Sequence, residues 1–339
     1  MKIAVLAPVA WRTPPRHYGP WEQIAFNIAE GLVKKGFDIT LFATRDSYTS
    51  GSLDGIVEKG YEEDKTLDAK VSECLHISYL MEKAGEYDII HNHFDFLPLT
   101  YSALIKTPVI TTIHGFSSEK IVPVYKRYNA INYYISISNS NRSTELNYLD
   151  TIYHGVEESA FSFNEKPSDY LLYFGRIHPD KGTYDAIQIA KAAGKKLIIA
   201  GIIQDKSYFK EKVEPFVDGE QIIFVGHAGP EKRNDLLGNA IALLHPIYFN
   251  EPFGLSIVEA MFCGTPVIAY NKGSMPELIQ NNISGFLVTN INEAFNAVSA
   301  IKNIDRKNCS IYARNKFSFH KMIEGYIKAY EYILLHPLK

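Results

Sequence analysis

Two glutamates form the most distinctive chemical pattern in this 339-residue sequence. Glu251 lies in a predicted loop and Glu259 in the helix predicted to follow, with seven residues between them. The backbone N–H groups of residues 253–255 lie at the predicted helix N-terminus, where they and the helix dipole favour an anion. Carboxylates accept paired hydrogen bonds from vicinal hydroxyls. The joint pattern predicts a site for a polyhydroxylated, phosphorylated ligand. Alternatively, Glu251 could be a helix cap and Glu259 a surface residue of the helix. These roles would account for each glutamate separately but not for the joint pattern.

Two cations flank a predicted strand-to-helix turn. Arg176 and Lys181 lie in the run FGRIHPDKG, at residues 174–182. Ligands of α/β proteins usually bind at the carboxyl edge of the sheet, where such a turn lies. Arg can grip phosphate oxygens with two hydrogen bonds, and Lys adds a point charge. The segment predicts a phosphate site, and a pair of ordinary surface cations is the alternative.

The first half of the chain carries less specific signals. Gly19 precedes a predicted helix, so the backbone there could approach an anion closely, although Gly19 could also only make a turn. His114 ends a predicted strand, where a lone histidine is more often a structural hydrogen-bonding residue. His91 and His93 point the same way along one strand, as metal ligands would, but further ligands at the usual spacing are missing. No GxGxxG follows the first strand, which disfavours a nicotinamide or flavin site.

The elements that must position these residues alternate between apolar strands and amphipathic helices. Such alternation predicts parallel sheets covered by helices on both faces. Strands of a first series are predicted at residues 2–7, 37–43, 89–93, 108–114 and 133–138, and those of a second at 170–177, 196–201, 221–226, 241–246 and 266–270. We expect an α/β protein with two doubly wound, Rossmann-like domains, 1–160 and 161–319, facing across a cleft. Residues 320–339 are expected to form a helix that packs back across the junction.

Net charge, cysteine content and the lack of certain sequence patterns disfavour several classes of partner and cofactor. The net charge is −3, which disfavours nucleic acid as a partner. Three widely spaced cysteines favour a reducing, cytoplasmic compartment, and no apolar run is long enough to span a membrane. No two aspartates stand two positions apart, so the sequence lacks the Asp-x-Asp with which many sugar-nucleotide enzymes hold Mg²⁺. We therefore expect neither a metal nor another cofactor.

Several of these segments together resemble a known family. They are EPFGLSIVEAMFCGTPVIA at 251–269, GRIHPDKG at 175–182, YGPWE at 18–22, TIHG at 112–115 and YHGVEESAF at 153–161. Over nearly its whole length, the chain is similar to the retaining nucleotide-sugar glycosyltransferases of the GT-B fold, in family 4. The family often has two glycines in the N-terminal loop, whereas here Pro20 follows Gly19, which removes one amide donor.

The resemblance implies a role for each candidate residue. Arg176 and Lys181 would bind the donor diphosphate, and Glu259 would bind the ribose hydroxyls. Glu251 and His114 would act as catalytic residues at the donor sugar. The other donor-binding residues implied are Gly19, Phe253, Gly254 and Leu255.

The expected reaction is transfer of a hexose from a nucleoside diphosphate sugar, with UDP-glucose as the predicted donor, to an acceptor hydroxyl with retention at the anomeric carbon. The acceptor would be a saccharide or lipid-linked saccharide, bound by segments 11–21 and 114–126. Polysaccharide or glycoconjugate biosynthesis is the expected setting, and peripheral membrane contact stays open. The alternatives are a sugar phosphorylase, a nucleotide-sugar epimerase or a non-catalytic nucleotide-sugar binding module, which acceptor dependence and donor turnover would distinguish.

Overall fold

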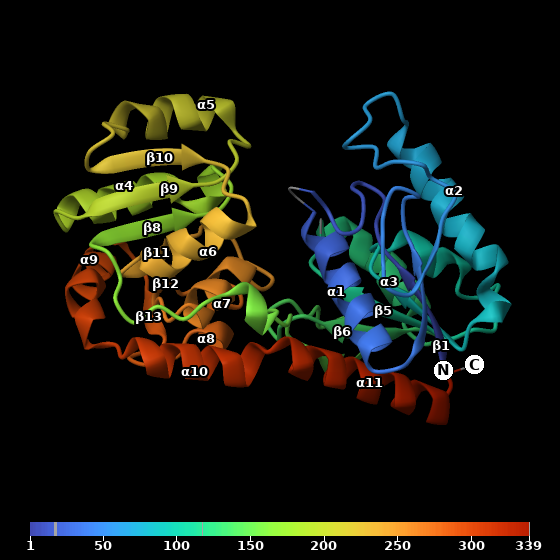
Figure 1. Cartoon of the computed structure of the whole chain (residues 1–339). Coiled ribbons are helices and arrows are strands. Elements are labelled where there is room, and N and C mark those ends of the chain that lie inside the picture. Colours follow the sequence, from blue (N-terminus) through green and yellow to red (C-terminus); the bar gives the residue numbers. More distant parts are fainter. Residues whose placement is uncertain (17–18, 117, 339) are drawn as a thin grey trace. The chain divides into compact units, whose positions relative to one another are not determined.

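The computed structural model describes residues 1–16, 19–116 and 118–338, and the chain divides into two compact units. The first unit comprises Met1–His154 together with His320–Lys339, and the second comprises Gly155–Phe319. The chain therefore passes from one unit to the other twice (Figure 1). The predicted boundary at residue 160 lies slightly after the first of these passages.

A parallel sheet forms the centre of the first unit. Among the described residues, its strand order is β3-β2-β1-β4-β5-β6-β7. The strands are β1 (Lys2–Leu6), β2 (Asp38–Phe42), β3 (Ser52–Asp54), β4 (Ile89–Asn92), β5 (Val109–Ile113), β6 (Tyr133–Ser136) and β7 (Tyr148–Thr151). The five predicted strands are confirmed. The edge strands β3 and β7 are missing from the prediction because they are short and partly exposed, without an apolar run.

Helices cover the two faces of this first sheet. Ile90 packs in one cluster with Ile77 and Leu80 of α2, whereas the next residue, His91, bonds to α11. Successive strand residues point to opposite faces, so α2 and α11 lie on opposite faces of the sheet. The helices of this unit are α1 (Pro20–Lys34), α2 (Ala69–Glu82), α3 (Val122–Tyr128) and α11 (Phe319–Leu335). The predicted C-terminal helix is thus confirmed.

The second unit repeats the architecture with a different set of strands. Among the described residues, the strand order is β10-β9-β8-β11-β12-β13, and all pairs are parallel. The strands are β8 (Tyr170–Phe174), β9 (Lys196–Ala200), β10 (Ile222–Gly226), β11 (Ala242–His245), β12 (Val267–Tyr270) and β13 (Gly285–Val288). Five of them match the prediction, and β13 is an additional edge strand.

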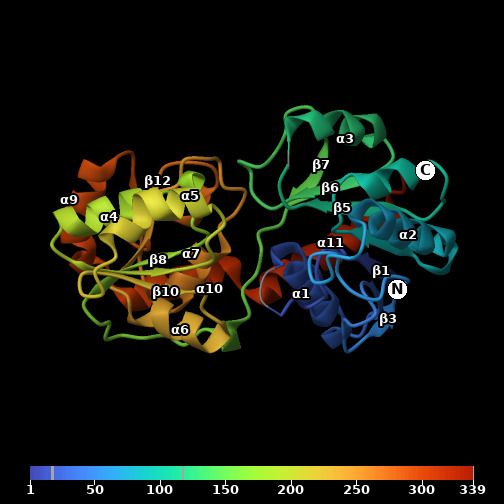
Figure 2. The same ribbon diagram turned by 90° about the horizontal axis from the view of Figure 1, so that it is seen from above.

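Helices also cover both faces of the second sheet. Helices α4 and α9 pack together, while α7 packs against α6 and α10 (Figure 2). The helices are α4 (Thr183–Ala192), α5 (Lys206–Tyr208), α6 (Pro230–Asn239), α7 (Leu255–Phe262), α8 (Met275–Leu278), α9 (Ile291–Ala300) and α10 (Arg306–Phe317). None of the helices in the described part of the chain has the length and apolar composition needed to cross a bilayer.

Each sheet reverses its strand order once. In the first unit β1 lies between β2 and β4, and in the second unit β8 lies between β9 and β11. The loops that leave two such neighbouring strands turn to opposite faces of the sheet and open a crevice at its carboxyl edge. The fold therefore offers one ligand position in each unit, after β1 and β4 and after β8 and β11.

Candidate active site

The loop after β8 meets the loop after β11 at a very close backbone approach. Gly182 has a φ of 68°, and a Cβ on it would lie 1.9 Å from the Pro246 carbonyl oxygen. Only glycine fits this left-handed position. The Tyr248 N–H donates to the Asp180 carbonyl at 2.8 Å, and the Tyr173 hydroxyl donates to the Arg176 carbonyl at 2.8 Å. These contacts fix the two loops that carry the predicted cations and Glu251.

Lys181 and Glu251 form an ion pair in the crevice. Their side chains are 13% and 14% exposed, so water screens the pair weakly. The Lys181 ammonium also lies 4.6 Å from the centre of the Phe249 ring. The sequence prediction assigns these residues to different parts of a donor, and the structure brings them into direct contact. Any ligand that engages either group must compete with this pair.

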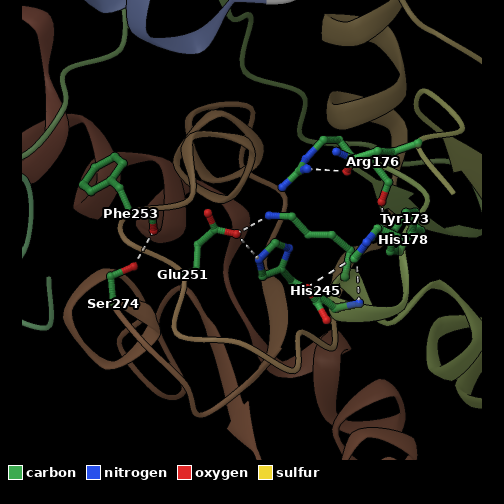
Figure 3. Close-up of polar contacts among 10 residues, drawn as sticks. Tyr173, Arg176, His178, His245, Glu251, Phe253 and Ser274 are labelled. Atoms are coloured by element: carbon green, nitrogen blue, oxygen red, sulfur yellow. Dashed lines mark hydrogen bonds and ion pairs between the residues drawn. The ribbon is translucent and has the colours of Figure 1, made fainter. Parts of the chain in front are cut away.

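A buried histidine lies behind the pair. His245 Nε2 is 3.8 Å from a Glu251 carboxylate oxygen, which is close but beyond hydrogen-bond range (Figure 3). Burial, with a smaller contribution from the Lys181 ammonium, lowers the pKa of His245 to about 3. His245 is therefore neutral, and Lys181 supplies the positive charge beside Glu251. His245 could not be identified from the sequence, because it lies inside an apolar strand and belongs to no motif.

Backbone contacts hold Glu251 and the start of α7. Ser274 donates from its N–H to the Glu251 carbonyl at 3.0 Å and from its hydroxyl to the Phe253 carbonyl at 2.5 Å (Figure 3). Gly254 has a φ of 102° and directly precedes α7, which begins at Leu255. The first N–H groups of a helix lack acceptors inside the helix and attract anions. The predicted amide-bearing residues thus lie at a true helix N-terminus.

Glu259 is buried in α7 and paired with Arg233 of α6. Burial raises the pKa of Glu259, and the Arg233 guanidinium opposes that rise. Arg233 also lies 5.3 Å from the Phe174 ring, at the end of β8. Sequence reasoning misses Arg233, since no motif contains it. The only signal was indirect: a buried carboxylate requires a cation.

Arg176 lies at the exposed edge of the same region. Its guanidinium donates to the Gln204 side chain, and the residue is the second after the end of β8. Figure 3 shows the side chains of Arg176, His245 and Glu251 gathered in one region. Arg176, Lys181, Glu251, Glu259 and the start of α7 therefore all belong to the second unit.

Gly19 and His114 belong to the first unit. Gly19 has a φ of 153° and directly precedes α1, while the preceding Tyr18 lies outside the described residues. His114 follows β5 and stacks on Trp21 with ring centroids 5.4 Å apart. The position of Gly19 at a helix N-terminus is as predicted.

His114 belongs to a row of buried imidazoles. Its Nε2 lies 2.9 Å from His93 Nδ1, and its Nδ1 lies 3.4 Å from His154 Nε2. The His91 ring lies 4.0 Å from the His93 ring, centroid to centroid, at a tilt of 45°, and His91 bonds to the Tyr330 hydroxyl at 2.7 Å. Burial and the neighbouring imidazoles lower the pKa values of His93 and His114 well below the usual value. Within residues 1–16, 19–116 and 118–338, no cluster of three or more His, Cys, Asp or Glu side chains could hold a metal ion.

Comparison with known families agrees with the geometry. Residues 156–316 match the family model described as Glycosyl transferases group 1, and residues 22–144 match the model described as Glycosyltransferase Family 4. The two matches include the loops after β8 and β11 and most of the first sheet. The chain belongs to the family 4 glycosyltransferases and has their GT-B fold of two Rossmann-like domains.

Individual relatives are distant in sequence but similar over most of their length. An uncharacterized glycosyltransferase of Methanocaldococcus jannaschii is 23% identical over 337 residues, which cover 85% of each chain. A sucrose-phosphate synthase from Thermosynechococcus elongatus has a TM-score of 0.78 at 18% identity, over 99% of both chains. The Anabaena protein HepE, solved with UDP and glucose, has a TM-score of 0.73 at 19% identity, over 98% of this chain and 99% of that one. At such identities these structures support the fold.

The buried histidines predict a loss of stability in mild acid. Burial lowers the pKa of His91 and of His154 to about 3, so below pH 6.5 the unfolded chain binds more protons than the folded chain. Their stabilisation is complete above about pH 6.5 and decreases toward pH 3, by about 1.4 kcal/mol per pH unit for each histidine. Urea unfolding at several pH values, followed by the fluorescence of Trp11 and Trp21, measures this in the first unit.

Two histidine variants control that experiment. His154→Gln removes one buried titrating group and should flatten the pH dependence, whereas His336→Gln, at an exposed position, should leave it unchanged. Identical slopes for the parent and both variants would contradict the assignment.

The Arg233–Glu259 pair generates a second prediction. Arg233→Met leaves the Glu259 carboxylate buried without its cation, and we expect a loss of about 1–3 kcal/mol near pH 7.5. Because the pKa of Glu259 is already raised, a proton neutralises it readily, so the loss should shrink as the pH falls toward 5. Denaturant unfolding followed by circular dichroism measures both effects. Lys232→Met, at the adjacent exposed position, is the control.

A double variant completes the set. Arg233→Met/Glu259→Gln removes both charges and should recover much of the lost stability at neutral pH. A double variant as unstable as Arg233→Met alone would show that the charge of Glu259 is not the cause.

Proposed function

We propose that this glycosyltransferase transfers glucose from UDP-glucose to an acceptor hydroxyl with retention at the anomeric carbon. The observation that carries the proposal is the pairing of Lys181 with Glu251 in the crevice after β8 and β11, next to the N-terminus of α7. The Lys181 ammonium can bind a diphosphate, and the Glu251 carboxylate can accept hydrogen bonds from sugar hydroxyls. The HepE complex with UDP and glucose supports this choice of donor for a protein of the same fold.

Each donor fragment has residues of suitable chemistry in the second unit. Arg176 and Lys181 bind the diphosphate, with the first amides of α7 adding donors for its oxygens. Glu259, held by Arg233, accepts hydrogen bonds from the ribose diol. Glu251 accepts from the hydroxyls of the donor sugar. The roles of Gly19 and His114 toward the donor stay predictions from the resemblance.

The proposed step exchanges one bond at the anomeric carbon for another on the same face. The bond from that carbon to the diphosphate oxygen breaks, and a bond to the acceptor oxygen forms. A donor phosphate oxygen takes the acceptor proton, so no separate base is required. The departing diphosphate gains negative charge, which Lys181 and Arg176 stabilise, while positive character on the sugar favours the Glu251 carboxylate nearby.

We expect the reaction to proceed without a divalent metal, in the cytoplasm. The sequence lacks an Asp-x-Asp, and Lys181 and Arg176 supply the charge that a metal would otherwise provide to the leaving group. UDP formation should therefore be unchanged in excess EDTA. Loss of turnover in the chelator, with recovery on adding Mg²⁺ or Mn²⁺, would overturn this part of the proposal.

Separate variants distinguish the roles of the two glutamates. Glu251→Gln removes the charge near the reacting carbon, so kcat should fall by about 100-fold. The same change frees Lys181 from its ion pair, so UDP should bind as tightly as before or more tightly. Glu259→Gln replaces one carboxylate oxygen by an amide, and we expect UDP affinity to fall by about tenfold or more.

Calorimetric titration with UDP and measurement of product formation test both variants after a check of folding. Glu220→Gln, at an exposed position of the same unit, is the matched control. Equal losses of UDP affinity in the Glu251 and Glu259 variants would contradict the division of roles, and full activity in both would remove the main support for the proposed function.

A further inference from the structure

The first unit contains a cavity of about 540 Å³, and none of the proposed donor-binding residues of the second unit is among its described lining residues. Its lining comes from the loop after β1, the start of α1, the segment between β3 and α2, α2 itself and the loop after β4. The lining residues are Pro8, Ala10, Trp11, Pro20, Trp21, Glu22, Tyr61, Glu73, Phe94, Asp95, Phe96 and Leu97. All twelve of these described residues lie in the first unit.

The position of the cavity is that of a ligand site. The strand order of the first sheet reverses between β1 and β4, and the loops leaving these two strands form the cavity walls. Crevices at such a reversal are where open α/β sheets bind their ligands. The cavity volume lies within the range of small-molecule sites, which is about 300–1,000 Å³.

Aromatic side chains form much of the wall. Five aromatic residues line it: Trp11, Trp21, Tyr61, Phe94 and Phe96. The C–H face of a pyranose ring is apolar and packs well on such rings, while its hydroxyls need polar partners at the ring edge. Trp21 also stacks on His114, so the cavity adjoins the residue that the family resemblance assigns to the reacting sugar.

Three carboxylates supply those polar partners, and a protein donor orients each of them. The Trp11 N–H donates to Glu22 at 3.3 Å, the Tyr61 hydroxyl donates to Glu73 at 3.0 Å, and the Tyr125 hydroxyl donates to Asp95. Burial raises the pKa of Glu22 to about 7. Burial, with a smaller contribution from the negative charge of Glu73, raises the pKa of Asp95 to about 6. These carboxyl groups already lie in surroundings that disfavour further negative charge.

The described part of the lining is acidic, aromatic and aliphatic. Among the twelve described residues that line the cavity, none is Lys, Arg or His. Arg16, on the loop after β1, instead pairs with Asp46 and Glu63. A phosphate group placed in this cavity would meet acidic side chains and no cationic side chain of the described lining, which is unfavourable in a partly buried site.

We propose that this cavity binds the acceptor and that Glu22, Glu73 and Asp95 restrict the acceptor to an uncharged sugar, excluding phosphorylated sugars. The inference rests on the proposed function, because it assumes that a sugar is transferred. It adds the chemical class of the acceptor and the residues that determine it. The lining contrasts with the phosphorylated sugar in the name of the sucrose-phosphate synthase of the same fold.

Matched pairs of probes that differ only by a phosphate test the proposal. Glucose and glucose 6-phosphate, and mannose and mannose 6-phosphate, are titrated into the UDP-bound protein, and binding is followed by ligand-detected NMR. Methyl glucoside and maltose extend the uncharged set. At least one uncharged sugar should bind, and each phosphate should bind at least about tenfold more weakly than its uncharged partner.

Substitution of one carboxylate should relax this discrimination. Glu73→Gln keeps a hydrogen-bond acceptor but removes a charge, so it should improve glucose 6-phosphate binding by about tenfold with little effect on uncharged sugars. Asp95→Asn should act in the same direction, and Asn tolerates the positive φ of 101° at this position. Glu82→Gln, an exposed change on the same helix as Glu73, is the control.

The outcomes separate this inference from the proposed function. Binding of the phosphates as tight as that of the uncharged sugars, or binding of no uncharged sugar, overturns the inference. If Glu73→Gln and Asp95→Asn discriminate against phosphorylated sugars as strongly as the parent protein does, these carboxylates are not the cause of the discrimination. UDP affinity, measured on the same samples, tests the donor site of the proposed function independently, because the residues proposed to bind the diphosphate and the ribose belong to the second unit.

Discussion

The reversal of strand order in each sheet is the constraint on which both candidate sites depend. Consecutive parallel strands on one side of β1 or β8 send their connections over one face of the sheet, and strands on the other side send theirs over the opposite face. No connection can cover the gap between the two diverging loops. The molecule therefore has an open crevice at β1/β4 and another at β8/β11, and chemistry-bearing residues lie in the loops beside both.

The two crevices differ in the partners of their acidic side chains. In the second unit both glutamates of the candidate site have a cation, Lys181 for Glu251 and Arg233 for Glu259. A ligand with phosphates and hydroxyls can replace these internal partners without leaving an unpaired charge. In the first unit the carboxylates around the cavity are satisfied by neutral donors such as Tyr61 and the Trp11 amide. A cavity wall of this kind favours a ligand with hydroxyl groups and disfavours an anionic ligand.

Much of the fold could be predicted because buried parallel strands are near-continuous apolar runs. The exceptions, β3, β7 and β13, are short edge strands. The residues of β3 and β7 are partly exposed and form no apolar run, and the apolar run of β13 is only three residues long. Glu251 and Glu259 were predicted from loop and helix positions, and Arg176 and Lys181 from a separate strand-to-helix turn. The family resemblance joined the two segments at one donor. The internal partners of these residues were not predicted, because the contact between Lys181 and Glu251 depends on the close backbone approach at Gly182, and Arg233 comes from a helix distant in sequence.

The row of imidazoles constrains the part that His114 can take. His93 and His154 lie on either side of it within 3.4 Å, and Trp21 covers its ring. A proton on His114 would be buried beside two further imidazoles, so its pKa lies well below the usual value, with burial as the main cause. A neutral His114 can orient a sugar hydroxyl by hydrogen bonding, but it cannot supply positive charge to a departing diphosphate. In the proposed reaction that charge must come from Lys181 and Arg176. Loss of His114 should therefore disturb the orientation of the sugar far more than the affinity for UDP.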